Sequence, residues 1–149
     1  MKKNVIKASS KKTLPVWAWV ALGVVVLLAV VWAMVALQPP AAVAALPAEI
    51  SVDQAALKRN QGAYMLDVRE QSEWDQFHIP GAALIPLGDL PNRLADVPKD
   101  REVVVVCRSG NRSATGRDIL LKAGYKQVTS MAGGVTEWQF KKLPIATGP

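Results

Sequence analysis

A run of 24 uncharged residues, 14–37, constrains this chain more than any other feature of its 149-residue sequence. As an α-helix rising about 1.5 Å per residue, the run would reach about 36 Å, more than the roughly 30 Å hydrocarbon core of a bilayer. Trp17 and Trp19 near its start and Trp32 near its end occupy positions where tryptophan favours the membrane interface. The run therefore predicts one transmembrane helix over 14–37, with a buried core helix as the alternative.

Positive charge precedes this run and predicts its orientation. The basic tail, residues 1–13, contains five lysines, and no acidic residue comes before Glu49. The positive-inside rule then predicts a cytoplasmic N-terminus and an extracytoplasmic remainder, periplasmic in a Gram-negative bacterium. The alternative is a signal peptide cleaved near residues 42–44, but its apolar region would be only about 7–15 residues long. An impermeant thiol reagent that labels a C-terminal cysteine reporter only in permeabilised cells would contradict this orientation.

The remaining composition limits what the rest of the chain can do. Without the five tail lysines, the chain has 13 basic and 12 acidic residues. This nearly neutral charge argues against nucleic-acid binding. One cysteine and one histidine exclude an internal disulfide and a Cys/His zinc cluster. Residues 38–48, rich in proline and alanine, predict a stiff linker. Residues 49–149 are then left for one modest domain.

Strand and helix signals alternate along this domain. Ser51 is placed to cap a first helix, and four consecutive valines, 103–106, predict a central strand that is buried on both faces. Gly124 is placed to end the helix expected over 113–123. The alternation predicts an α/β fold with a mostly parallel central sheet covered by helices on both faces. The expected strands are 63–66, 82–86, 102–106 and 128–131, and the further helices are 71–77, 90–97 and 135–140.

The chemistry is expected where the valine strand ends, at Cys107. In open α/β sheets, the crevice beyond the carboxyl ends of the strands is the usual ligand position. A short loop that runs into a helix start directs backbone N–H groups inward and adds the positive end of the helix dipole. In such settings the pKa of a thiol falls from about 8.5 to roughly 3.5–7.5. Cys107 is thus the predicted nucleophile, with a small buried core residue as the alternative reading. The residues predicted to form its anion-binding loop are Arg108, Ser109, Gly110, Asn111, Arg112 and Ser113.

This loop, CRSGNRS at residues 107–113, resembles the active-site loop of the rhodanese-like sulfurtransferases. The resemblance continues over about residues 50–146, nearly all of the predicted domain, in the right order and spacing. The tail, the apolar run and the linker lie outside it. The other segments that carry the resemblance are 66–70 (LDVRE), 73–74 (EW), 78–82 (HIPGA), 133–135 (GGV), Trp138 and 143–145 (LPI).

The resemblance implies a three-layer rhodanese-like fold and a sulfur-transfer reaction. The Cys107 thiolate would take the outer sulfur of a small anionic donor such as thiosulfate and hold it as a persulfide, which cyanide, a thiol or a protein would remove. Backbone N–H groups of the loop would stabilise the persulfide and the leaving anion, and Arg108 and Arg112 would help to bind the donor. Neither a metal nor an organic cofactor is implied.

Two alternative functions and one alternative residue role stay open. Related phosphatases and arsenate reductases place five residues between cysteine and arginine, whereas here Arg112 follows after four, so the loop is one residue short for a tetrahedral oxyanion. A membrane-tethered binding or sulfur-relay module without catalysis is the alternative from another class. Asp67 could be a general acid, although a structural role, bonded to loop backbone or Arg112, is favoured.

Three further residues have structural interpretations. His78, the only histidine, could act as a base for the thiol, but in the family pattern its position belongs to a turn away from the nucleophile. Trp74 and Trp138 are expected to be packing residues. All three are therefore predicted to stabilise the domain rather than to take part in the chemistry.

Overall fold

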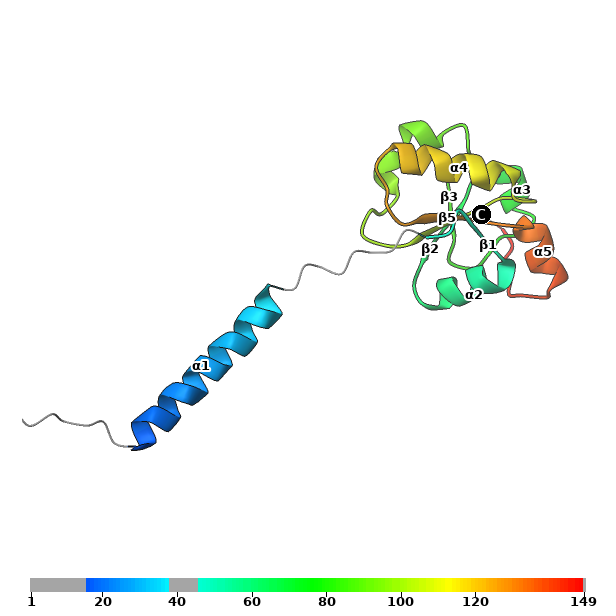
Figure 1. Ribbon diagram of the computed structural model, residues 1–149. Helices are drawn as coiled ribbons and strands as arrows, with labels where there is room; N and C mark the ends of the chain where they lie inside the picture. The colour runs from blue at the N-terminus through cyan, green and yellow to red at the C-terminus, as the bar shows by residue number, and fades with distance from the viewer. Residues whose placement is uncertain (1–15, 38–45, 149) are drawn as a thin grey trace, which may run out of the picture. The chain divides into compact units, whose positions relative to one another are not determined.

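The computed structural model describes residues 16–37 and 46–148, which belong to two separate compact units divided after Val43 (Figure 1). In the first unit, α1 spans Val16–Ala36. Among the described residues, no helix was found to combine the length and the hydropathy needed to cross a membrane. The transmembrane segment over 14–37 therefore stays a prediction. The basic tail, 1–13, and linker residues 38–45 lie outside the described residues.

The second unit is built on a five-stranded sheet in which every strand pair is parallel. The central strand is β4, Val103–Val106, and its four valines are fully buried, as the unbroken apolar run predicts. The predicted α/β fold with a parallel sheet is confirmed. From edge to edge, the strands are β1 (Glu49–Ile50), β5 (Val128–Met131), β4, β2 (Tyr64–Asp67) and β3 (Ala83–Leu84).

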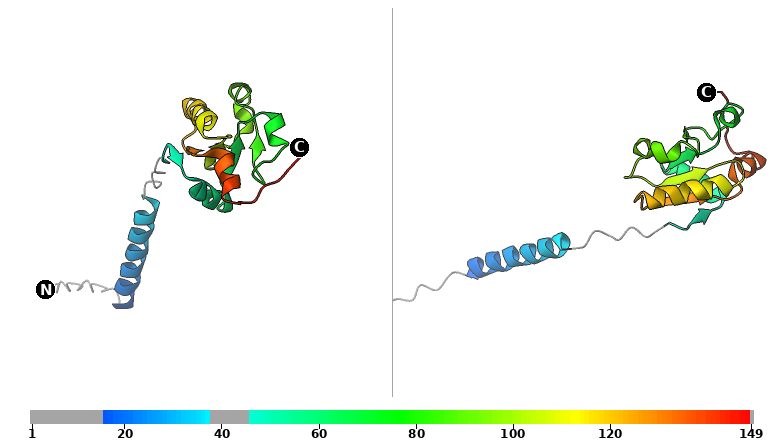
Figure 2. Two further views of the ribbon diagram at one scale, coloured as in Figure 1. Left: turned by 90° about the vertical axis from the view of Figure 1, so that its right-hand side faces the viewer. Right: turned by 90° about the horizontal axis from the view of Figure 1, so that it is seen from above.

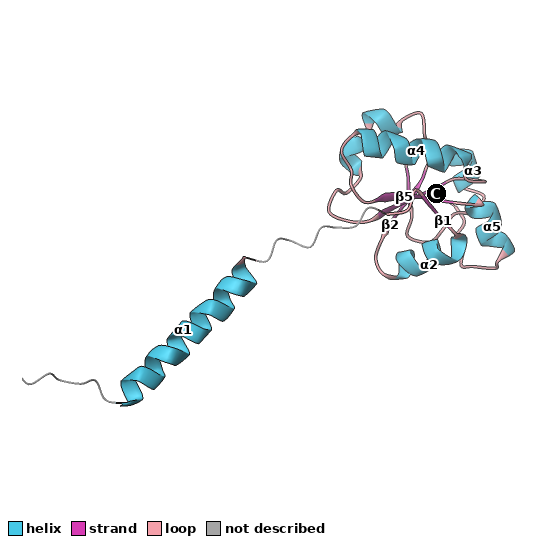
Figure 3. Cartoon of the chain, viewed as in Figure 1, coloured by secondary structure: helices cyan, strands magenta, loops and turns pink. Residues whose placement is uncertain are grey.

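Helices cover both faces of this sheet (Figures 1 and 2). On one face, Leu120 of α4 (Asn111–Lys122) packs with the β4 side chains Val103 and Val105. On the other face, α2 (Val52–Asn60) and α5 (Gly134–Phe140) pack against the alternate β4 positions. The side chains of β4 thus divide between two cores with the period of two that a strand imposes. Figure 3 shows the same layers by secondary structure.

Local signals placed several elements correctly. Ser51 caps α2 as expected, and its hydroxyl accepts a hydrogen bond from the Gln54 N–H while the Gln54 side chain bonds the Ser51 N–H in return. The strand expected over 128–131 is β5 itself. The two-residue strand β1 at one edge was not expected, because so short a segment carries no periodic signal.

Other elements differ from their predicted form. The helix expected over 71–77 ends at Trp74, as α3 (Gln71–Trp74). The helix expected over 90–97 is instead two 3₁₀ turns, η1 (Leu90–Asn92) and η2 (Leu94–Asp96). The Tyr125 hydroxyl contacts the carbonyls of Leu94 and Val97 as a donor, and the Leu94 carbonyl also accepts from the Val97 N–H within the 3₁₀ turn.

Candidate active site

Cys107 directly follows β4 and points to the same side of the sheet as α4. Alternation along the strand places it on the face of Val103 and Val105, and its side chain is buried with them. The chain then turns through Gly110, whose φ of +112° favours glycine, and α4 begins at Asn111. The helix starts two residues earlier than predicted, so Asn111 and Arg112 form its first turn rather than the loop.

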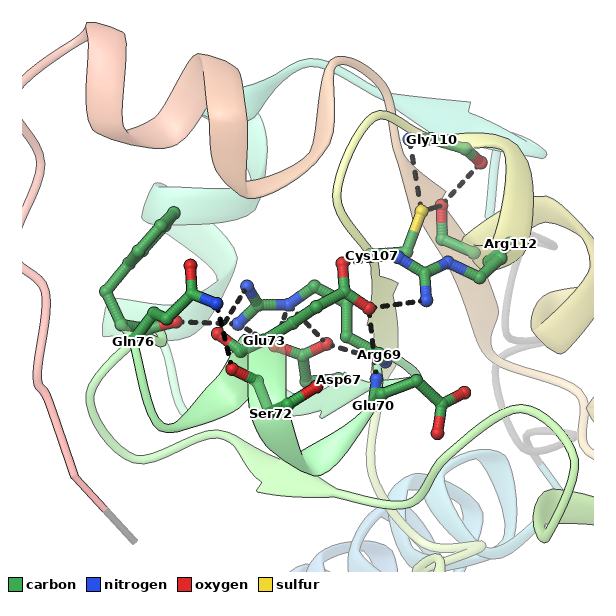
Figure 4. Close-up of polar contacts among 11 residues, drawn as sticks. Asp67, Arg69, Glu70, Ser72, Glu73, Gln76, Cys107, Gly110 and Arg112 are labelled. Atoms are coloured by element: carbon green, nitrogen blue, oxygen red, sulfur yellow. Dashed lines mark hydrogen bonds and ion pairs between the residues drawn. The ribbon is translucent and has the colours of Figure 1, made fainter.

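The sulfur of Cys107 contacts two groups of this turn, the Gly110 N–H and the Ser113 hydroxyl (Figure 4). The Gly110 N–H donates to Sγ at 3.1 Å. The Ser113 hydroxyl lies 3.7 Å from Sγ and donates to the Gly110 carbonyl at 2.7 Å. Gly110 and Ser113 are therefore the predicted loop residues that contact the thiol directly. This arrangement can stabilise negative charge on sulfur.

The balance of burial and hydrogen bonding lowers the pKa of the Cys107 thiol. Burial by itself raises this pKa, because it disfavours the charged thiolate. The backbone N–H and the hydroxyl of Ser113, with the backbone N–H groups of Gly110 and Ser109, act in the opposite direction and outweigh burial. The thiolate is thus populated at a lower pH than in a free cysteine.

A pH profile of alkylation should show this lowered pKa. Because the thiolate is the reacting form, the rate of iodoacetamide modification of Cys107 should reach half its plateau below the value of about 8.5 that free cysteine shows. Ser113→Ala removes a hydroxyl that favours the thiolate, so the midpoint should move upward. Thr115→Ala, on the exposed side of the same helix, is the control and should leave the midpoint in place. A midpoint at or above that of free cysteine in the unmodified chain would contradict the assignment.

The first carbonyls of the loop are held by α5. The Val135 N–H donates to the Cys107 carbonyl at 2.8 Å. The Arg108 carbonyl accepts from the Thr136 N–H at 3.1 Å and from the Thr136 hydroxyl at 2.8 Å. Gly134 lies between these contacts, so close to the carbonyls of Cys107 and Arg108 that a Cβ atom there would overlap them. Because these carbonyls are bound to α5, the loop can direct N–H groups toward the sulfur.

The two predicted arginines have different surroundings. Arg112 forms a bidentate ion pair with Glu73 of α3, at 2.7 and 2.8 Å, and does not contact Asp67 as expected (Figure 4). The pair, assisted by the Glu70 N–H, lowers the pKa of Glu73 to about 2 against the partial burial that raises it, and it raises the pKa of Arg112. The positive charge of Arg112 is therefore compensated. No role for Glu73 was predicted.

Asp67, at the end of β2, bonds to Arg69 instead. Both side chains are buried, and the Arg69 guanidinium donates to both carboxylate oxygens of Asp67 at 2.7–3.0 Å. It also donates to the backbone carbonyls of Glu73 and Phe77, at 3.3 and 2.8 Å. The expected structural role of Asp67 thus holds with a different partner. The pair ties the sheet to α3, which carries Glu73.

The remaining loop residues, Arg108, Ser109 and Asn111, are exposed. Arg108 lines a pocket of about 200 Å³ beside the loop, which we call the side pocket. Its other walls include Gln76 and Phe77 after α3, and Thr136 and Gln139 on α5.

A second pocket, of about 350 Å³, lies away from the thiol. Its lining includes Gly62 and Ala63 before β2, and Arg101 and Glu102 before β4. It therefore opens at the amino ends of the strands, whereas Cys107 follows the carboxyl end of β4. Of these two pockets, the smaller side pocket is the one whose lining includes a loop residue, Arg108.

His78 and the tryptophans lie in packing positions. The His78 ring stacks on Trp74 with 3.7 Å between centroids, and its Nδ1 lies 3.2 Å from the Trp74 carbonyl. The Trp138 indole donates to the Pro144 carbonyl at 2.8 Å. The described part of the chain contains no group of three or more His, Cys, Asp and Glu side chains placed to hold a metal ion.

Comparisons with known proteins match the domain that carries this site. A model of the family described as Rhodanese-like domain matches residues 51–141. A sulfurtransferase from Allochromatium vinosum is 37% identical over 89 residues, covering 60% of this chain and 83% of that protein. Thiosulfate sulfurtransferase GlpE from Pseudomonas savastanoi pv. phaseolicola is 32% identical over 90 residues, covering 60% of this chain and 85% of that protein.

Larger relatives match over part of their length. The probable adenylyltransferase/sulfurtransferase MoeZ of Mycobacterium tuberculosis is 39% identical over 82 residues, which are only 21% of that protein. Among solved structures, a rhodanese-related protein from Thermoplasma volcanium has a TM-score of 0.61 at 25% identity, covering 67% of this chain and 98% of that one. A rhodanese-like domain protein from Staphylococcus aureus has a TM-score of 0.56 at 29% identity, covering 62% and 91%.

Proposed function

The chain belongs to the rhodanese-like domain family, and from this premise we propose that it is a sulfurtransferase that carries sulfur as a persulfide on Cys107. Relatives named as sulfurtransferases support sulfur transfer in general. The donor is a small anion such as thiosulfate, which agrees with the name of the Pseudomonas relative, thiosulfate sulfurtransferase. The acceptor is cyanide, a thiol or a protein.

The reaction has two steps, which balance without an external oxidant or reductant. In the first step the Cys107 thiolate attacks the outer sulfur of thiosulfate, the sulfur–sulfur bond of the donor breaks, and sulfite leaves with its electron pair. In the second step an acceptor nucleophile attacks the outer sulfur of the persulfide, and Cys107 leaves as the thiolate. Each step develops negative charge near the loop, where the N–H groups of Gly110 and Ser113 can stabilise it.

The contact between the Gly110 N–H and the sulfur carries the proposal. It directs a backbone donor at a cysteine whose pKa is lowered. A buried core cysteine needs no such donor, so this contact favours a nucleophile over the packing alternative. The phosphatase alternative needs the arginine that ends the loop to be free to bind an oxyanion, and Arg112 is paired with Glu73.

Intact mass spectrometry of the full-length chain tests the proposal. After reduction and treatment with thiosulfate, the chain should gain one sulfur atom, and cyanide should remove it. Cys107→Ser keeps the size of the side chain but lacks the thiolate, so it should gain nothing. Uptake of sulfur by the serine variant would overturn the assignment to Cys107.

A binding or sulfur-relay module is the second candidate. Relatives such as MoeZ combine a sulfurtransferase with another activity in one protein, which favours a domain that receives sulfur from a protein partner. Absence of mass gain from thiosulfate, together with gain from a persulfidated protein donor, would support this version and contradict thiosulfate as the donor.

A further inference from the structure

We propose that the domain binds the surface of an anionic phospholipid bilayer through a basic patch at the amino ends of its strands. The inference does not depend on the sulfur chemistry, because it concerns the end of the sheet opposite the end at which Cys107 lies. The patch comprises four exposed cations: Lys99, Arg101, Lys122 and Lys126.

The parallel sheet brings these four residues together from separate segments of the chain. Lys99 and Arg101 precede β4, Lys126 precedes β5, and β4 and β5 are neighbours in the sheet. Lys122 ends α4, which returns the chain from the carboxyl end of β4 toward the amino end of β5. The Lys99 ammonium lies 5.0 Å from the centroid of the Tyr125 ring, so the segments before β4 and β5 are in contact.

The positive charge of the patch is uncompensated. Within the described chain, none of its four cations lies within ion-pair distance of a carboxylate. Asp100 lies between Lys99 and Arg101 in the sequence, and this one carboxylate among the four cations leaves a net charge of +3. Arg69 and Arg112, near Cys107, are in contrast each paired with a carboxylate. The charge of the patch therefore favours an anionic partner.

Apolar side chains and a pocket adjoin the patch. The last turns of α2 and α4 lie at this end of the sheet and expose Leu57 and Leu121, by 58% and 43%. Arg101 lines the second pocket, of about 350 Å³, and donates to the Gly62 carbonyl at 2.6 Å, which leaves its other N–H groups for a phosphate. Cations beside exposed leucines are typical of surfaces that bind lipid headgroups.

The path of the chain favours a bilayer over other anionic partners. The Thr129 hydroxyl donates to the Pro47 carbonyl at 2.7 Å, and the Ser130 N–H donates to the Ala48 carbonyl at 3.0 Å. The residues before β1 therefore run beside β5 and reach the domain from the amino ends of the strands. Residues 38–48, which follow the predicted transmembrane run, can extend to about 40 Å at most. A run that spans a bilayer thus keeps the patch near its surface.

Binding through the patch leaves the catalytic loop on the water side of the domain. Cys107 follows the carboxyl end of β4, whereas Lys99 and Arg101 precede its amino end. A bilayer at the patch therefore covers neither the loop nor the side pocket. Donor and acceptor can then reach Cys107 from solution.

Lysine acetylation of the full-length chain in vesicles tests the patch. One vesicle preparation is phosphatidylcholine alone, and the other is an equal mixture of phosphatidylcholine and phosphatidylglycerol. A brief pulse of sulfo-N-hydroxysuccinimide acetate, which does not cross the bilayer, labels outward-facing domains, and peptide mass spectrometry gives the rate at each lysine. The anionic vesicles should slow acetylation of Lys99, Lys122 and Lys126 about fivefold or more, because one cation at such a surface is already favoured about fivefold. NaCl at about 1 M should remove the difference, since the Debye length falls to about 3 Å.

Lys142 is the internal control, because it lies at the other end of the domain. Its neighbour Lys141 pairs with Asp53 in the first turn of α2, at the carboxyl ends of the strands. Lys142 should be acetylated at the same rate in both vesicles. Lys126→Glu should reduce the protection of Lys99, whereas Lys142→Glu, the matched charge reversal, should leave it unchanged. Both variants should still take up sulfur from thiosulfate, which shows that they are folded.

The outcomes separate the patch from the predicted transmembrane run and from sulfur transfer. Equal acetylation of the patch lysines in the two vesicles overturns the proposal, even where the chain floats with both. Salt-sensitive protection in a chain that floats only with anionic vesicles supports the patch and contradicts the transmembrane run. Protection by duplex DNA, without protection by anionic vesicles, assigns the patch to nucleic acid and overturns the proposal. Sulfur uptake from thiosulfate tests the proposed function independently of all three.

Discussion

Replacing Gly134 with alanine should lower the free energy of unfolding of the domain by about 3 kcal/mol or more and abolish persulfide formation. Gly134 has a φ of +59°, which costs an L-residue roughly 1–2 kcal/mol. Its Cβ would also overlap the carbonyls of Cys107 and Arg108. Relieving such an overlap costs a further 1–3 kcal/mol or so. Urea unfolding followed by tryptophan fluorescence measures the loss of stability, and sulfur uptake measures the loss of function.

Gly62→Ala is the matched control, because it separates the cost of a positive φ from the cost of a Cβ overlap. Gly62 has a φ of +93°, but an added Cβ there would meet nothing within 4 Å. The Gly62→Ala variant should therefore lose only about 1–2 kcal/mol of the free energy of unfolding and still take up sulfur. Equal losses in the two variants would show that the α5 contact does not constrain the loop.

The position of the Cys107 thiol was predictable from local sequence, whereas the contacts that hold its loop were not. The valine strand, Gly110 and the start of a helix lie within a few residues of Cys107, so strand and turn chemistry predict where the thiol lies. The contact of Gly134 with the loop joins segments that are distant in sequence. A glycine pair indicates a turn, but nothing in it shows which carbonyls lie beside it.

The ion-pair partners of charged residues that are distant in sequence were likewise not predictable from the sequence. The Glu73–Arg112 pair joins residues 39 positions apart, and many other pairings of the acidic and basic residues were equally possible from the sequence. The pairing of Asp67 with Arg69, in contrast, could have been predicted from the spacing of the two residues in the sequence. In extended backbone, side chains two residues apart point to the same side, and this favours Arg69 over Arg112 as the partner of Asp67.

The segment 90–97 shows why periodicity alone was insufficient. Its spacing of apolar residues fits a helix, and Leu90 and Val97 are buried as that spacing implies. The backbone nevertheless forms 3₁₀ turns, and the Tyr125 hydroxyl from after α4 binds its carbonyls. A tertiary hydrogen bond of this kind has no local sequence signal.

Arg69→Met should be the most destabilising single substitution of a charged residue around the site, with a loss of about 3–5 kcal/mol. Methionine fills similar space but leaves the Asp67 carboxylate buried without its cation. The variant also loses the hydrogen bonds from Arg69 to the carbonyls of Glu73 and Phe77, which hold the end of α3. We expect α3 to shift, and sulfur uptake to slow because Glu73 no longer holds Arg112.

The double variant Asp67→Asn, Arg69→Met tests whether the unpaired charge causes this loss. Removing both charges eliminates the buried unpaired carboxylate, so the double variant should be more stable in urea than Arg69→Met alone. The lost contacts to α3 remain lost, so it should stay less stable than the unmodified chain. If the double variant is as unstable as the single one, the stabilising role of Arg69 lies in its bonds to the α3 backbone rather than in its pairing with Asp67.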